Sequence, residues 1–549
     1  MTPANPTSPA SGTSEPYLAA YYQGLDHGSV QTARQVLLDA LAPAPEHVWL
    51  ECGRALVLRA DMEAALAVFA RASACYPASG ELCVGLAGLY WQMHSHAQAE
   101  GLLRDWLSQH PTHVGASFLL VRLLLEQGRV QAATDTLLQL FEHGWHDADT
   151  VILAVEVLDD CGRPQDAARI CEAALSGGLQ EDPRLHAYAG MLGIQLGQFH
   201  RVREHYDFAL AHATDAVEWN IPIGLSGLQR YTDANHPDFA LFRRVLAQPG
   251  LSEKARTTTL FALGKACDDI ADYAQAAVHF REANARAKAI GSWSRKQWKR
   301  IVEARLAAPP CPWILAAPTD WVPVFIVGVP RSGTTLLAEL IARHPLVCNR
   351  GELGWLQQVA QKLSTAPRDR SKPFEDAAAV YAAHLRQDDS NARWFIDKQP
   401  LNLLHIDLIM ALWPNARIIH CQRNSRDIAL SLWSQSFHDR AHDYAYDFAD
   451  IAAMIRGCHR LMSHWHARYA SSIHTVRYED LVHEPGACIA TLARWLGLPE
   501  LDPPHSSSDD RAIRTASAWQ ARQPVYTRSV GRWRDYLPYL PELLKFHHD

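Results

Sequence analysis

A spacing of 34 residues recurs through the first part of this 549-residue chain. Alanine holds the same place in four successive units, at Ala65, Ala99, Ala133 and Ala167. The prolines Pro77 and Pro111 keep the same interval. A small residue is needed where two helices touch, because a larger side chain would hold them apart. A unit of this length buries its apolar face only against its neighbours, so the pattern predicts a helical solenoid.

Two of these units, "DMEAALAVFARASACYP" (residues 61–77) and "SHAQAEGLLRDWLSQHP" (residues 95–111), resemble the tetratricopeptide repeat. The resemblance extends over about residues 16–295, and we place the α-helical solenoid at residues 16–305. It implies paired helices with a concave surface that holds a peptide, an acceptor or a partner protein. The alternative, a scaffold that packs on the rest of the chain or on another copy, stays open because a repeat fold does not fix its ligand.

Composition and charge indicate which partners and which cell compartment we expect for this chain. A net charge of −7 gives the whole chain no attraction to nucleic acid or to an acidic membrane. The eleven cysteines show no paired spacing, which is typical of a reducing compartment. Residues 1–15 are rich in Pro, Ser and Thr and are predicted to be a disordered leader. No apolar run approaches the roughly 20 residues of a membrane-spanning helix. We expect a cytoplasmic protein with no nucleic-acid or membrane partner; the oligomeric state stays open.

The pattern changes after a Pro-rich segment at residues 306–321, which we interpret as a linker. Apolar strands then alternate with helices, the strands being expected at residues 322–328, 393–398, 416–423 and 473–478. Such alternation predicts an α/β domain with a parallel sheet over residues 322–549. In these folds ligands bind beyond the C-terminal ends of the strands.

The first of these strands runs into the loop "GVPRSGTT", Gly328–Thr335. Successive backbone amides at a helix N-terminus favour an anion, and Arg331 adds a cation. Ser332, Thr334 and Thr335 add hydroxyl groups. Kinase-type loops place a lysine where Thr334 stands, and no acidic partner for Mg²⁺ follows. The loop therefore predicts a phosphate ligand that needs neither a triphosphate chain nor a metal; the alternative is a structural strand-to-helix turn.

This loop resembles the 5′-phosphosulfate-binding loop of sulfotransferases. Three further segments are similar to that family: "CQRNSRDIALSLW", "VRYEDLV" and "RQPVYTRSVGRWRDY". The resemblance covers residues 322–549 and is nearest to the tyrosylprotein-sulfotransferase-like branch and to bacterial proteins that join tetratricopeptide repeats to such a domain. It implies a P-loop-like sulfotransferase fold and 3′-phosphoadenylyl sulfate as donor, without metal. The residues that it implies for donor binding are Arg331, Ser332, Gly333, Thr334, Thr335, Arg423, Ser431, Tyr478, Ser529, Arg532 and Trp533.

The same resemblance implies the catalytic groups. Glu352 stands eight residues after His344, where tyrosylprotein sulfotransferases carry a catalytic glutamate after a His-Pro pair, so we expect it to be the general base. Lys398, in "FIDKQPLN", is expected to stabilise the leaving oxygen together with Arg331. The run G-E-L-G departs from the family's G-E-E-T-R. The hydroxyl acceptor therefore stays open between protein tyrosine, peptide, glycan and small molecule.

Three alternatives remain at this stage. Cytosolic sulfotransferases use a histidine base, which makes His344, His405 and His420 secondary candidates. A P-loop kinase or NTPase would also bind phosphate, although its lysine and Mg²⁺ carboxylates are missing. Finally, the repeats could form an adaptor whose C-terminal domain binds nucleotide but is inactive.

Overall fold

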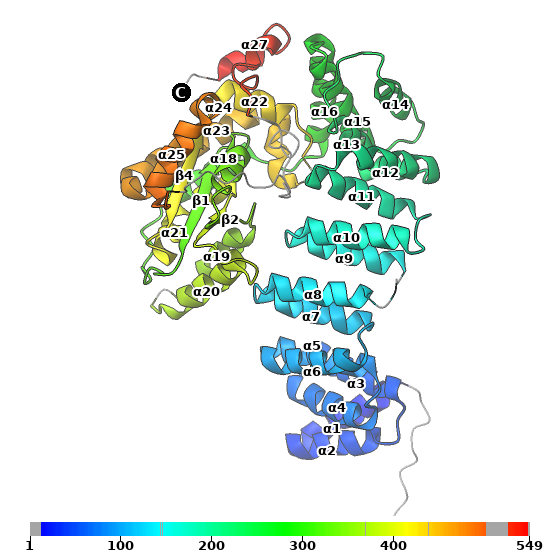
Figure 1. Ribbon diagram of the computed structural model, residues 1–549. Coiled ribbons are helices and arrows are strands. Elements are labelled where there is room, and N and C mark those ends of the chain that lie inside the picture. Colours follow the sequence, from blue (N-terminus) through cyan, green and yellow to red (C-terminus); the bar gives the residue numbers. More distant parts are fainter. Residues whose placement is uncertain are drawn as a thin grey trace, which may run out of the picture. The chain divides into compact units, whose positions relative to one another are not determined.

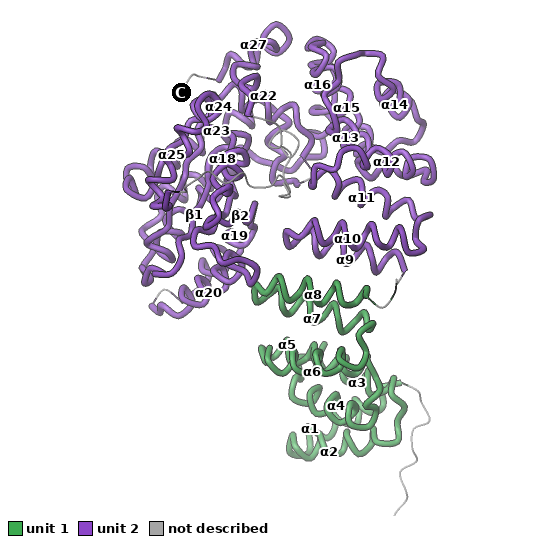
Figure 2. Tube along the Cα trace, in the orientation of Figure 1, with its two compact units in different colours: residues 1–146 green, residues 147–549 purple. Residues whose placement is uncertain are grey.

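The computed structural model describes residues 13–142, 144, 147–367, 369–437, 439–500 and 525–546. The chain forms two compact units, residues 1–146 and 147–549, coloured separately in Figure 2.

The first unit is a stack of paired helices. Its described helices are α1 (Glu15–His27), α2 (Val30–Leu41), α3 (Glu46–Leu58), α4 (Met62–Cys75), α5 (Gly80–Gln92), α6 (His96–Gln109), α7 (Val114–Glu126) and α8 (Val130–Phe141). Ala65, Ala99 and Ala133 are buried, as their place in the repeat predicts. Gly53 is needed for close packing, because a Cβ there would lie 2.5 Å from the Phe69 ring.

The second unit begins with more helix pairs of the same kind, shown in green and cyan in Figure 1. They are α9 (Ala148–Asp160), α10 (Pro164–Ser176), α11 (Pro183–Leu196), α12 (Phe199–His212), η1 (Ala216–Trp219), α13 (Ile221–Ser226), α14 (Pro237–Leu246), α15 (Glu253–Asp269), α16 (Tyr273–Ile290) and α17 (Arg295–Leu306). Ala167, Ala276 and Ala283 are buried in these pairs. The predicted α-helical repeat region is confirmed.

A parallel sheet of five strands follows, in the order β2-β3-β1-β4-β5. The strands are β1 (Val322–Gly328), β2 (Val347–Asn349), β3 (Trp394–Asp397), β4 (Arg417–Gln422) and β5 (Ile473–Arg477). The predicted parallel α/β sheet is therefore confirmed. Strand β2 was not predicted, because its three residues are too short to show a pattern.

Helices cover both faces of the sheet, and the side chains of β1 alternate between them. Val324 and Ile326 pack with α18 (Thr334–Ile341) and α25 (Pro485–Leu496), whereas Phe325 and Val327 belong to the core on the other face. The remaining elements are α19 (Trp355–Ser364), α20 (Lys372–Arg386), η2 (Pro400–His405), α21 (Ile406–Leu412), α22 (Ser425–Trp433), η3 (Arg440–Tyr446), α23 (Phe448–Tyr469), η4 (Ala470–Ser472), α24 (Tyr478–His483), α27 (Trp533–Tyr536) and η5 (Pro541–Lys545).

Repeat helices α12 to α17 share one hydrophobic core with the sheet. The buried residues of that core extend from Val202 in α12 to Phe546 near the end of the described chain. Trp298 of α17 packs against Gly457 of α23 and donates a hydrogen bond of 3.0 Å from Nε1 to the Ala453 carbonyl. These repeat helices are consequently an integral part of the second unit.

The Pro-rich segment at residues 306–321 lies against the sheet-bearing part of the second unit. Its Cys311 amide donates to Asp407 Oδ2 at 3.0 Å, and its Leu315 amide donates to the Ala411 carbonyl at 2.9 Å. Its backbone is thus held by specific hydrogen bonds to α21.

In the part of the chain that the structure describes, no helix combines the length and the apolar character needed to cross a bilayer.

Trp298→Ala is expected to lower the free energy of unfolding of the second unit by about 3–5 kcal/mol, because it leaves a cavity where α17 meets α23. Chemical denaturation followed by circular dichroism measures the change. Leu544→Ala, at an exposed position, serves as the control. A loss below about 1 kcal/mol for Trp298→Ala would contradict a core shared by the repeats and the sheet.

Candidate active site

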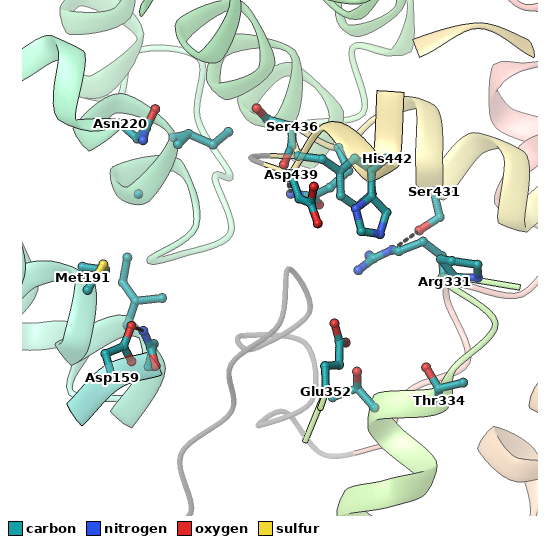
Figure 3. Close-up of a pocket in the computed structure, with 18 of the residues that line it drawn as sticks. Asp159, Met191, Asn220, Arg331, Thr334, Glu352, Ser431, Ser436, Asp439 and His442 are labelled. Atoms are coloured by element: carbon teal, nitrogen blue, oxygen red, sulfur yellow. Dashed lines mark hydrogen bonds between the residues drawn. The ribbon is translucent and has the colours of Figure 1, made fainter. Parts of the chain in front are cut away.

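A cavity of about 1620 Å³ lies within the second unit. One side is lined by the loop after β1 and by residues from α22, from the segment before α27 and from the turns after β3 and β4. The other side is lined by the repeat helices α9, α11 and α13. Figure 3 shows Arg331, Glu352 and Ser431 on one side, with Met191 and Asn220 across from them. The C-terminal ends of the parallel strands therefore open into a space that the repeats close.

The loop after β1 has a backbone that two glycines make possible. Gly328 has φ +155°, and a Cβ there would lie 2.6 Å from the Cys421 carbonyl oxygen. Gly333 has φ +98°, and a Cβ there would lie 2.4 Å from the Tyr478 ring. Arg331 also adopts a positive φ, +74°. Because L side chains rarely adopt these values, the loop conformation is specified by its sequence.

Two arginines from adjacent strand ends meet beside this loop. Arg331 Nε donates to Ser431 Oγ at 2.9 Å. Arg423 donates to the Arg331 carbonyl at 2.9 Å and to the Ser529 carbonyl at 2.8 Å, and its guanidinium lies 4.4 Å from the centre of the Tyr478 ring. Burial and, to a smaller extent, repulsion from Arg423 together lower the pKa of Arg331 to about 10. Two neighbouring cations beside the amides of a helix N-terminus suit an anionic ligand.

Buried donors at the loop support the same conclusion. Ser332 is 1% exposed, and its Oγ has no hydrogen-bond partner among the described residues. Arg423 Nε is buried and also lacks a partner within that part of the chain. Thr334 and Thr335 line the cavity at the start of α18, whereas Ser332 is not among its lining residues. Unsatisfied buried donors are rare in proteins and are often completed by a ligand or water.

A carboxylate and an ammonium group meet next to the loop. Lys398, directly after β3, has a side chain that is only 2% exposed, and its Nζ hydrogen-bonds to Glu352 Oε1. The Glu352 side chain is 39% exposed and lines the cavity. Lys398 itself is not part of the lining, so it reaches the cavity through its contact with Glu352.

Asp397, next to Lys398 in the chain, holds the backbone around this pair through hydrogen bonds. Its carboxylate accepts hydrogen bonds from Tyr381 Oη, from Asn402 Nδ2 at 2.8 Å and from the Leu353 amide at 3.3 Å. Full burial raises the pKa of Asp397 to about 7, although these donors and Lys398 act in the opposite direction. Asp397 thereby ties the backbone next to Glu352 to the end of β3.

The C-terminal segment contributes Ser529 and Arg532 to the lining. Arg532 forms an ion pair of 2.6 Å with Asp268 of α15, and Tyr536 Oη donates to the same carboxylate at 2.5 Å. Burial lowers the pKa of Arg532, but Asp268 and Tyr536 outweigh it and raise that pKa above its ordinary value. A repeat helix therefore holds Arg532 in place.

Trp533 lies next to Arg532 but outside the cavity lining. Its ring is buried, with the Arg426 guanidinium 4.4 Å from the ring centre, and its amide donates to Asp427 Oδ1 at 3.1 Å. Asp427 Oδ2 also accepts from the Gly531 amide at 2.7 Å. Nine of the eleven implied donor-binding residues thus line the cavity. Ser332 lies within the loop that lines it, and Trp533 packs outside the lining.

The secondary histidine candidates lie outside the lining. Burial lowers the pKa of His405 and of His420 to about 3 each, and Arg305 and His466 respectively add to that shift. His344 Nε2 contacts the Pro499 carbonyl at 3.1 Å.

Several lining residues are not among the candidate site residues named from the sequence. His442 faces the cavity, and its ring stacks on Phe437 with centroids 4.7 Å apart. Asp427 could have been suspected from its place in the helix that follows Arg423. Asp268 and the repeat-side residues gave no signal, because nothing in the sequence pairs them with residues more than 100 positions away.

Within the described residues, no group of three or more His, Cys, Asp or Glu side chains is arranged to hold a metal ion.

Comparisons with known proteins agree with this architecture. Residues 323–503 match the model of the sulfotransferase family, and residues 91–144 match that of the tetratricopeptide repeat. An uncharacterized protein of Aquifex aeolicus is 25% identical over 540 residues, spanning 91% of this chain and 69% of that protein. Protein-tyrosine sulfotransferase 1 of Danio rerio is 26% identical over 236 residues, 39% of this chain and 66% of its own length.

A solved structure, the sulfotransferase domain from the Synechococcus PCC 7002 olefin synthase, is 21% identical with a TM-score of 0.30, covering 43% of this chain and 98% of that one. The two family models thus match separate parts of the chain, residues 91–144 among the helical repeats and residues 323–503 in the part that carries the sheet.

Asp397→Asn tests the buried support of Glu352. Because burial raises the pKa of Asp397 from 3.8 to about 7, the folded state holds a proton that the unfolded state releases between these values. The free energy of unfolding of the wild type, minus that of Asp397→Asn, is expected to fall as the pH rises from about 4 to about 7. Urea titrations across this range measure it. A difference that rises with pH would show that the carboxylate is ionised in the fold.

Proposed function

We propose that the chain is a 3′-phosphoadenylyl sulfate-dependent sulfotransferase that transfers a sulfuryl group to a hydroxyl acceptor. One observation carries this proposal: a single cavity is lined by the loop after β1, by Arg423 and Ser431, and by Glu352, which contacts Lys398. The first two suit the two phosphate positions of the donor, and the third suits the chemistry of the transfer.

Donor binding uses groups that line the cavity at the ends of β1 and β4. The amides at the start of α18, together with Arg331 and Thr334, suit the 5′-phosphosulfate. Arg423 and Ser431 suit the 3′-phosphate, since a planar guanidinium and a hydroxyl match phosphate oxygens. Binding of an anion here also relieves the repulsion between the two guanidinium groups. Ser332, Gly333 and Thr335 shape the loop.

The rim of the donor site comes from more distant segments. Tyr478 lies against Arg423, Ser529 accepts from it, and Arg532 adds a third cation that Asp268 fixes. Trp533 is positioned to support this segment from behind, through Arg426 and Asp427.

Glu352 and Lys398 perform the transfer in this proposal. The donor supplies a sulfuryl group on an activated phosphate oxygen. Glu352 accepts the proton of the acceptor hydroxyl as its oxygen bonds to sulfur. Lys398 and Arg331 stabilise the phosphate oxygen from which the sulfuryl group departs, so the charge that develops is met by two fixed cations. The Glu352–Lys398 contact keeps both groups aligned before the reaction.

The acceptor is a hydroxyl compound that enters from the repeat side of the cavity. The name of the Danio rerio relative indicates protein tyrosine as its acceptor, and tyrosine is within the class that we propose here. Because the repeats line this cavity, they are placed to bind the acceptor directly.

Transfer of label from ³⁵S-labelled donor to components of a lysate of the source organism tests the activity. Glu352→Gln and Lys398→Ala are each expected to lower turnover by about 10²-fold or more, because each removes a group that acts in the transition state. Binding of adenosine 3′,5′-bisphosphate, measured by calorimetry, is expected to be retained.

Glu375→Gln, an exposed position on α20, provides the matched control and should leave turnover unchanged. Unaltered turnover in both site variants would refute the assigned roles. Mg²⁺-dependent ATP hydrolysis without affinity for adenosine 3′,5′-bisphosphate would favour a P-loop NTPase instead.

A further inference from the structure

The repeat side of the cavity is more acidic than the donor side. Its carboxylates are Asp149, Glu156, Asp159, Asp160 and Glu218, and its cations are Arg184 and Lys254. Arg184 forms an ion pair of 2.6 Å with Asp149. The donor side carries the arginines 331, 423 and 532 together with the carboxylates of residues 352, 427 and 439, so its formal charges balance. The excess of carboxylates on the repeat side favours a cationic ligand there over the anionic donor.

Apolar side chains lie between these carboxylates. The apolar residues that line this wall are Ile152, Leu153, Ala187, Met191, Ile194, Trp219 and Ile223. Leu153 is 46% exposed, which is high for a large aliphatic side chain. Tyr188 is held in position by a hydrogen bond from its Oη to Glu156. A surface that mixes carboxylates with exposed aliphatic and aromatic groups suits a ligand with both cationic and apolar parts.

A polar group on this wall also lacks a partner. The Asn220 carboxamide lines the cavity, and its Oδ1 is buried without a hydrogen-bond partner among the described residues. Asn220 has φ +63°, so its position is fixed by a turn between η1 and α13. Figure 3 places it across the cavity from Ser431. A carboxamide oxygen in this state accepts a hydrogen bond from an N–H donor, such as a peptide backbone.

The size of the cavity exceeds what one nucleotide needs. Pockets for small molecules span about 300–1,000 Å³. The cavity here measures about 1620 Å³, so space for a second, larger ligand remains beside the donor.

We propose that the acceptor is a peptide segment with basic residues near its hydroxyl group, held by the acidic side chains of α9 and the apolar side chains of α11. This inference rests on the proposed function, because it identifies the acceptor for the same reaction. Basic side chains pair with Glu156 and Asp160, and apolar side chains contact Leu153 and Met191. The peptide lies between this wall and Glu352, which then meets its hydroxyl group.

Selection from a display library of short random peptides tests this inference. The bait is the full chain, saturated with adenosine 3′,5′-bisphosphate so that the donor site is filled. Selected peptides are expected to be enriched about tenfold in Lys and Arg over Asp and Glu, relative to the starting library. The double variant Glu156→Gln/Asp160→Asn should weaken binding of a selected peptide about tenfold, equivalent to about 1.4 kcal/mol. Higher salt should weaken it as well.

Glu204→Gln is the matched control, because Glu204 is exposed on the neighbouring helix α12 and does not line the cavity. Thermal melting and binding of adenosine 3′,5′-bisphosphate verify that the double variant folds and keeps its donor site. Enrichment of acidic peptides, no enrichment of any peptide, or equal binding by the double variant would overturn the inference. If the wild type does not bind adenosine 3′,5′-bisphosphate, that result would instead count against the proposed function.

Discussion

The reciprocal contact between Arg331 and the segment around Arg423 organises the site. Arg331 reaches from the loop after β1 to Ser431 on α22, and Arg423 reaches from the end of β4 to the Arg331 carbonyl. Two guanidinium groups are thereby held close to each other although they repel, and burial together with this repulsion lowers the pKa of Arg331. Under the proposed function, the phosphates of the donor would offset this repulsion. The parallel order of β1 and β4 makes it possible, because their C-terminal ends lie side by side.

The repeats matter to the site because they belong to the same packed body as the sheet. The core that begins at Val202 continues through the sheet to Phe546. Asp268 on a repeat helix fixes Arg532, and α9 and α11 form the far wall of the cavity. Different parts of the second unit therefore line one cavity.

Sequence patterns predicted the features that local physics determines. Periodic alanines predicted the solenoid, alternating apolar runs predicted the parallel sheet, and Gly328–Thr335 predicted the loop between the first strand and its helix. Anion binding by that loop stays a prediction. The family resemblance supplied Arg423 and Ser431, and the structure brings both beside that loop.

Features that depend on long-range packing were not predictable in this way. The Asp268–Arg532 ion pair joins residues more than 260 positions apart, and no periodicity connects them. The burial of Trp533 against Arg426 follows from how the C-terminal segment packs, which a motif does not encode. The acidic side chains of α9 face the strand ends only because the chain folds back over a long distance, which no local pattern encodes.

A crystal structure of the full chain with adenosine 3′,5′-bisphosphate tests the central claim most directly. The account predicts one phosphate on the backbone amides at the start of α18 and the other on Arg423 and Ser431, with the nucleotide spanning the two strand ends. A nucleotide bound elsewhere, or with only one phosphate held by these groups, would contradict it.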